Sequence, residues 1–163
     1  LTRGYTTKGV DTMTFDSVEE LRKISAVHDK PELFLRIAVS DATATHPLSG
    51  KFGADPVKAA PELLRDAAEM GLPVTGVCFH VGSRCNDPTS FGDGLQHARN
   101  LFRIGRSFGH RMQIVDVGGG FPGTDHHAPF EKIAASIRSG VREHFFGQSV
   151  RMIAEPGRFF ATR

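Results

Sequence analysis

Short apolar runs alternate along this chain with longer stretches in which apolar residues recur every three or four positions. The short runs predict β-strands, because a strand that is covered on both faces reads as a nearly continuous apolar segment. Arg36 is the one charge inside the second run. The expected strands are residues 12–15, 33–39, 74–81, 113–117 and 150–154.

The stretches between these runs predict helices. Ser17 and Glu20 lie three residues apart, as in a capping box at a helix start. Asp55-Pro56 and Asp87-Pro88 each combine an N-cap residue with a proline that is favoured in the first helical turn. The expected helices span about residues 17–28, 55–70, 87–108 and 130–146.

The strand and helix order predicts an α/β fold with parallel strands and right-handed crossovers. An open doubly wound sheet and part of a (β/α)8 TIM-type barrel both satisfy this order. A whole barrel takes about 250 residues. The 163 residues therefore predict a single domain over 1–163, either a doubly wound sheet or a barrel arc of about five strands with two open edges.

Composition narrows the class of protein. Hydrophobic residues make up 39% and charged residues 23%, as in a folded protein, and the net charge is only +2. This charge gives no electrostatic reason to expect nucleic acid or an anionic membrane as partner. No apolar run approaches the roughly 18 residues of a membrane span. We expect a cytoplasmic, reducing environment and a chain that is cut at both ends.

Polar or glycine-rich sequence follows every predicted strand, where parallel α/β proteins place their ligand chemistry. Three consecutive glycines after a strand allow backbone N–H groups to approach an anion such as phosphate, although a tight turn explains them equally well. The glycine-rich segment DVGGGFPG (116–123) matches neither a GxGxxG fingerprint nor a P-loop, and this disfavours ATP as a ligand. The strand-end residues are Asp16, Arg36, His80, Gly82, Ser83, Asp116, Gly118, Gly119, Gly120, Glu155, Gly157 and Arg158.

Taken singly, these residues also have structural explanations. Arg158 fits a bidentate phosphate contact, or a surface ion pair with Glu155 contributing about 0–1 kcal/mol. His80 alone fits a core histidine, and Ser83 fits a helix cap.

No metal site is predicted, because His126 and His127 are adjacent and point apart in most conformations. Cys78 lies inside an apolar run and is expected to be a buried thiol. Cys85 is a weak candidate for a reactive cysteine.

Six segments in order resemble the eukaryotic-type ornithine decarboxylase family, within the fold type III, alanine-racemase-like pyridoxal-phosphate enzymes. The resemblance covers nearly the whole chain except its first eight residues. The segments are MTFDS (13–17), LRI (35–37), KFG (51–53), FHVGS (79–83), DVGGGFPG (116–123) and EPGR (155–158).

The resemblance implies a partial (β/α)8 TIM-type barrel that binds pyridoxal 5'-phosphate, and it gives catalytic roles to three residues. His80 matches the histidine that stacks on the pyridine ring, and Glu155 matches the acid that pairs with the ring nitrogen. Arg36 matches an arginine beneath the cofactor that helps to set the electrostatics.

The same resemblance implies a phosphate site. Ser83 and Arg158 match the serine and arginine that contact the phosphate, and Gly120 matches the glycine whose backbone meets it. The implied cofactor-binding set is His80, Ser83, Gly118, Gly119, Gly120, Glu155, Pro156, Gly157 and Arg158.

The implied activity of the parent protein is conversion of L-ornithine to putrescine and carbon dioxide in polyamine synthesis. The family's Schiff-base lysine precedes MTFDS, and its C-terminal β-domain follows Arg163, so the fragment alone is expected to be inactive. The resemblance implies a homodimer and a possible antizyme-like regulator as partners. A sister decarboxylase for arginine, lysine or diaminopimelate, and a non-catalytic regulator similar to antizyme inhibitor, stay open as alternatives.

Overall fold

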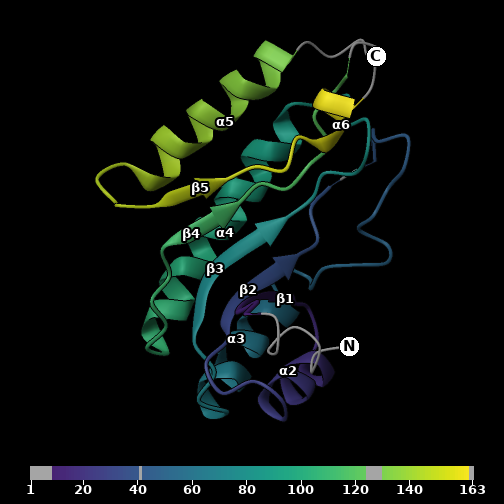
Figure 1. Cartoon of the computed structure of the whole chain (residues 1–163). Helices are drawn as coiled ribbons and strands as arrows, with labels where there is room; N and C mark the ends of the chain where they lie inside the picture. The colour runs from purple at the N-terminus through teal and green to yellow at the C-terminus, as the bar shows by residue number, and fades with distance from the viewer. Residues whose placement is uncertain (1–8, 41, 124–129, 162–163) are drawn as a thin grey trace.

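Five parallel strands form one sheet in the order β1-β2-β3-β4-β5 (Figure 1). The computed structural model describes residues 9–40, 42–123 and 130–161. A doubly wound sheet reverses its strand order at a switch point, whereas these strands follow the chain order throughout. The arrangement is therefore an arc of a barrel, and the doubly wound alternative is wrong. The strands are β1 (Thr12–Phe15), β2 (Glu32–Ile37), β3 (Val74–Phe79), β4 (Ile114–Asp116) and β5 (Arg151–Ile153).

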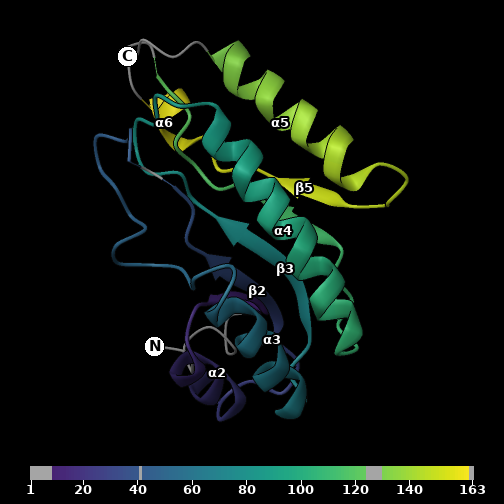
Figure 2. The ribbon, with the colours of Figure 1, turned by 180° about the vertical axis from the view of Figure 1, so that it is seen from behind.

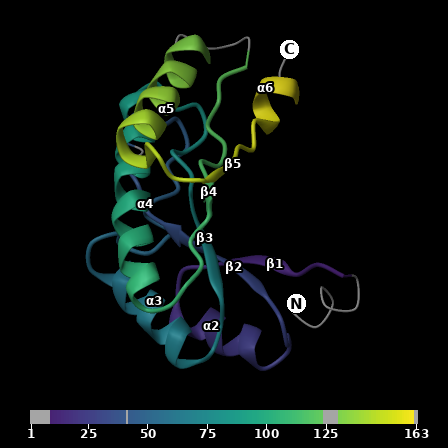
Figure 3. The same ribbon diagram turned by 90° about the vertical axis from the view of Figure 1, so that its left-hand side faces the viewer.

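The helices gather mainly on one face of this sheet. Figures 2 and 3 show α3, α4 and α5 lining that face, with α2 beside α3, while α6 lies on the opposite side. Within the described ranges, no helix has the length and apolar character needed to cross a membrane. The helices are α2 (Val18–Ser25), α3 (Ala59–Glu69), α4 (Thr89–Ser107), α5 (Phe130–Phe145) and α6 (Gly157–Ala161).

The helix starts follow local hydrogen bonds. Ser17 Oγ accepts the Glu20 N–H at 3.4 Å, which confirms the expected cap of α2. Asp55 Oδ1 instead accepts the N–H groups of Val57 and Lys58, and these bonds close a turn before α3. Helix α3 therefore begins later than the sequence predicted.

The short helix α6 was not predicted from the sequence. The Gly157 N–H donates to the Glu155 carbonyl at 2.8 Å, which closes a tight turn over Glu155, Pro156 and Gly157. The chain then continues for one helical turn through Phe159 instead of remaining extended. A segment of five residues carries too little periodicity for sequence analysis to detect.

The two faces of the sheet differ in their apolar content. The face toward the helices carries the main core, whose largest fully buried side chains include Phe15, Phe79, Phe91 and Phe102. The opposite face carries only a small apolar cluster of Phe34, Cys78 and Ile114, with Ile153 packed against it. The first face stabilises the fold, and the second is left for polar groups.

The segment that follows β2 returns across the ends of the strands. Ile37 pairs with Ala54, and His46 pairs with Ser83 through two backbone hydrogen bonds of 3.2–3.3 Å. The Gly53 N–H donates to Asp16 Oδ2 at 2.8 Å. This segment therefore joins the carboxyl ends of β1, β2 and β3.

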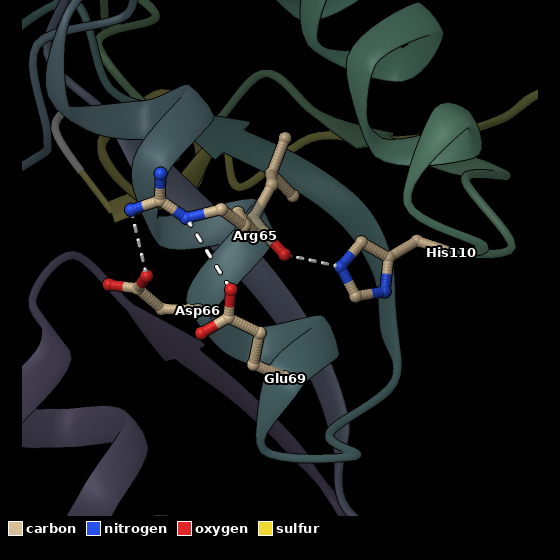
Figure 4. A network of polar contacts seen from close by, with 5 residues as sticks. Arg65, Asp66, Glu69 and His110 are labelled. Carbon is tan, nitrogen blue, oxygen red and sulfur yellow. Dashed lines mark hydrogen bonds and ion pairs between the residues drawn. The ribbon is translucent and has the colours of Figure 1, made fainter.

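At the opposite end of the strands, a buried histidine joins α3 to β3. His110 Nδ1 accepts the Val74 N–H at 3.4 Å. Its Nε2 lies 2.8 Å from the Leu64 carbonyl oxygen (Figure 4). A neutral imidazole with its proton on Nε2 satisfies both contacts. The neighbouring ion pairs of Arg65 with Asp66 and Glu69 lie at the surface.

Candidate active site

The carboxyl ends of all five described strands converge on a cavity of about 180 Å³. Arg36, Cys78 and Asp116 are register partners on β2, β3 and β4, so their side chains share one row on the face away from the main core. Glu155 follows β5 at the same end. The cavity is lined by Thr14, Arg36, Cys78, Phe79, His80, Asp116, Gly118 and Glu155.

His80 is oriented by the turn that follows it. Its Nδ1 accepts the Gly82 N–H at 3.0 Å, so the proton of a neutral ring resides on Nε2. A Cβ at Gly119 would lie 2.7 Å from that Nε2 atom. Only glycine at position 119 allows the turn after β4 to approach the imidazole this closely.

The turn after β4 also packs against the end of β3. Gly118 has a φ of +63°, and a Cβ there would lie 2.2 Å from the Phe79 carbonyl oxygen. Gly120 lies against Val81 and Gly82. The three glycines therefore form a tight turn that brings bare backbone to the cavity edge, an arrangement that suits an anion.

The carboxylates of the site differ in their surroundings. Asp116 is buried, with 7% of its surface exposed, and burial raises its pKa, while the hydrogen bond from Gly118 and the charge of His80 oppose that change. Partial desolvation raises the pKa of Glu155, the Asp116 charge raises it further, and Arg36 acts in the opposite direction. The Glu155 carboxylate at the edge of the cavity thus binds a proton more readily than an isolated glutamate does.

Arg36 supplies positive charge to the cavity wall. Its guanidinium lies 5.0 Å from the centre of the Phe52 ring, which belongs to the segment following β2. A cation over an aromatic face is attracted by the ring quadrupole. Phe52 therefore helps to hold Arg36 in place from the side of that segment.

The structure brings together part of the set expected from sequence. Arg36, His80, Gly118 and Glu155 line one cavity, and Gly119 touches His80. The remaining residues lie on turns or on α6 and do not line this cavity. These are Ser83, Gly120, Pro156, Gly157 and Arg158.

Four lining residues had received no catalytic or cofactor role from the sequence: Thr14, Cys78, Phe79 and Asp116. Asp116 alone among these four had been named as a strand-end residue. Cys78 is a buried free thiol, as expected, and burial raises its pKa to about 12. Strand register is the signal that would have singled out Asp116 among the strand-end residues, because it places this residue beside Cys78 and Arg36. Register cannot be read from an apolar run alone.

Cys85 is also a buried free thiol, and its Sγ donates to the Asp87 carbonyl at 3.3 Å. Over the described ranges, no three His, Cys, Asp or Glu side chains are grouped as a metal site requires. His126 and His127 lie outside those ranges.

A barrel-type parallel sheet with a glycine turn and charged side chains at its strand ends is the arrangement in which barrel domains bind ligands, often through a phosphate group. The family model described as "Pyridoxal-dependent decarboxylase, pyridoxal binding domain" matches residues 3–162. The chain therefore belongs to the pyridoxal-dependent decarboxylase family and corresponds to its pyridoxal-binding domain.

Individual relatives agree with this assignment. The ornithine decarboxylase of Caenorhabditis elegans is 57% identical over 155 residues, which cover 95% of this chain and 37% of that protein. Antizyme inhibitor 2 of Xenopus laevis is 43% identical over 156 residues, covering 94% of this chain and 34% of that protein. The crystal structure of an arginine decarboxylase from Paramecium bursaria Chlorella virus superposes with a TM-score of 0.90 at 34% identity, over 98% of this chain and 42% of that chain.

Proposed function

We propose that the protein containing this chain is an ornithine decarboxylase that uses pyridoxal 5'-phosphate and releases carbon dioxide from L-ornithine to give putrescine. The observation that carries the proposal is the cavity that unites Arg36, His80 and Glu155 beside the glycine turn. The 57% identity to a nematode ornithine decarboxylase supports this substrate over others. The chain spans about a third of its curated relatives, so the activity is assigned to the longer protein.

The residues of the site fit the cofactor. Glu155 lies at the edge of the cavity, where its ionised carboxylate could accept a hydrogen bond from the protonated nitrogen of a pyridine ring. The His80 ring, held by the Gly82 N–H, offers a flat surface for stacking. Bare glycine backbone, the Ser83 hydroxyl and the Arg158 guanidinium suit a phosphate dianion.

When bound, the cofactor supplies an electron sink for the electrons left by departing carbon dioxide. The chain's own contribution is to keep a negative charge at the ring nitrogen through Glu155 and to hold the phosphate end through Arg158. Arg36 adds positive charge to the wall of the same cavity, and Phe52 keeps it there.

The decisive experiment is an assay of the full-length protein with L-ornithine, L-arginine, L-lysine and diaminopimelate. We expect putrescine from L-ornithine at the highest kcat/KM. A higher kcat/KM for another amino acid would assign a sister decarboxylase. The isolated 163-residue chain serves as a control and is expected to be inactive.

Two substitutions in the full-length protein separate chemistry from cofactor binding. Glu155→Gln is expected to lower kcat more than cofactor affinity, because it removes the charge at the ring nitrogen. Arg158→Ala is expected to weaken cofactor binding more than kcat at saturating cofactor, because the phosphate loses its charge partner. Fluorescence titration of the cofactor together with steady-state kinetics checks both, and equal effects on the two quantities would contradict these roles.

A regulator that binds a protein partner without catalysis is the second candidate, and the 43% identity to antizyme inhibitor 2 favours including it. The presence of His80, Ser83, Gly120, Glu155 and Arg158 favours the enzyme. Titration with pyridoxal phosphate separates the two, because a regulator that has lost the cofactor would show no saturable visible absorbance.

The proposal also covers the oligomeric state, cellular location and regulation of the full-length protein. A homodimer in the cytoplasm, serving polyamine synthesis and open to an antizyme-like regulator, is what the family resemblance supports. Sedimentation velocity of the full-length protein and fractionation of its source cells test the first two points.

A further inference from the structure

Asp116 is a buried acidic side chain for which the roles outlined above give no purpose. It ends β4, and it lines the cavity with His80 and Glu155. Burying a carboxylate costs free energy unless hydrogen bonds or opposite charge compensate for it. Its surroundings are therefore informative about what it does.

Two hydrogen bonds connect Asp116 to the backbone of Glu155. Asp116 Oδ1 accepts the Gly118 N–H at 2.9 Å, and the Gly118 carbonyl accepts the Glu155 N–H at 2.8 Å. Gly118 has the positive φ that this path requires. The Asp116 side chain is thus linked to the Glu155 backbone by two hydrogen bonds that both involve Gly118.

Charge supplies a second connection. The negative charge of Asp116 raises the pKa of Glu155, in the same direction as desolvation does. Arg36 on β2 opposes this effect, and His80 after β3 stabilises the Asp116 charge. Cys78 on β3, with a pKa of about 12, remains a neutral thiol.

We propose that Asp116 is a positioning residue for Glu155: it fixes the Gly118 turn, whose carbonyl oxygen accepts the Glu155 N–H. The Asp116 carboxylate also places negative charge near Glu155, in addition to its role in fixing the turn. The contact with a cofactor ring nitrogen rests on the function proposed above. The link between Asp116 and Glu155 does not, because it is a property of the chain itself.

Two variants of the full-length protein separate geometry from charge. Asp116→Asn keeps an oxygen that accepts the Gly118 N–H and removes the charge, whereas Asp116→Ala removes both. Asp55→Asn is the matched control, because Asp55 also accepts backbone N–H groups but is exposed and does not line the cavity.

The first readout needs no cofactor. Titration of Glu155, followed by ¹³C NMR of labelled glutamate and assigned with Glu155→Gln, should move to lower pH in Asp116→Asn and stay unchanged in Asp55→Asn. The amide resonances of Gly118 and Glu155 should remain near their wild-type positions in Asp116→Asn and move in Asp116→Ala. An unchanged Glu155 midpoint in Asp116→Asn overturns the charge role, and unmoved amides in Asp116→Ala overturn the geometric one.

The second readout uses pyridoxal phosphate labelled with ¹⁵N at the ring. In Asp116→Ala, which loses the hydrogen bond to the Gly118 N–H, the ring-nitrogen resonance should move from its wild-type position as Glu155 shifts, and a resonance that stays in place counts against the proposal. If the wild-type protein binds no cofactor, the proposed function fails, while the cofactor-free titration still decides the role of Asp116.

Discussion

Gly118 and Gly71 adopt nearly the same backbone angle in different surroundings. Their φ values are +63° and +70°, but a Cβ at Gly118 would lie 2.2 Å from a carbonyl oxygen, whereas nothing lies within 4 Å of one at Gly71. The first glycine is required by both conformation and space, and the second by conformation alone. The two positions therefore allow the cost of close approach to be measured separately.

Gly71→Ala is expected to cost about 1–2 kcal/mol, the penalty of a left-handed conformation for an L-residue. Gly118→Ala should cost more, because the backbone of β3 or of the turn must also move. Thermal unfolding should give a midpoint at least about 3 °C lower for Gly118→Ala than for Gly71→Ala. Equal unfolding midpoints would show that the turn at Gly118 can accommodate a Cβ without added cost.

Cys78 has a raised pKa of about 12, against an ordinary value of 9.0. At pH 9 its thiolate fraction in the folded protein should be several hundred-fold below that of an unfolded chain, so alkylation by iodoacetamide should be slow. The folded state keeps a proton that the unfolded state releases. Its contribution to stability is therefore complete below about pH 9 and is lost as the pH rises toward 12. Mass spectrometry of the alkylated peptide measures the rate at which Cys78 reacts. Rapid labelling of the folded protein at pH 9 would contradict the raised pKa of Cys78.

At the scale of elements, the apolar pattern was sufficient to predict the five strands and the helices α2 to α5. The ends of strands shifted by one or two residues, and α3 began four residues after Asp55 because that side chain caps a preceding turn. The position of the site at the strand ends was also predictable, since it follows from parallel order. The pairing of Asp116 with Cys78 and Arg36 was not, because it depends on register between strands far apart in sequence.

His110 and Arg65 illustrate which polar contacts hold these elements together. Replacing His110 with Leu leaves the Val74 N–H and the Leu64 carbonyl without their buried partner, which should cost about 1–3 kcal/mol. Arg65→Ala removes two ion pairs of a side chain that is 53% exposed, and it should cost about 0–1 kcal/mol. Urea unfolding of the two variants measures the difference, and a larger loss for Arg65→Ala would contradict this ranking.

At the scale of the whole molecule, β1 and β5 form the two outer edges of the described sheet. Exposed edges present backbone donors and acceptors to other chains. The isolated 163-residue chain is therefore expected to self-associate as its concentration rises, whereas the full-length protein should keep one sedimentation coefficient. Sedimentation velocity over a tenfold concentration range tests this, and a chain that remains monomeric throughout would show that the edges are protected.

The unequal apolar content of the two sheet faces has a consequence for how the sequence can diverge. Nearly all of the large apolar side chains lie on the helix side, while the opposite face keeps only Phe34, Cys78, Ile114 and Ile153 beside its polar groups. Substitutions of the polar side chains on that second face are expected to change what the molecule binds more than whether it folds. Related genes can therefore diverge in the chemistry of this face while keeping the same folded framework.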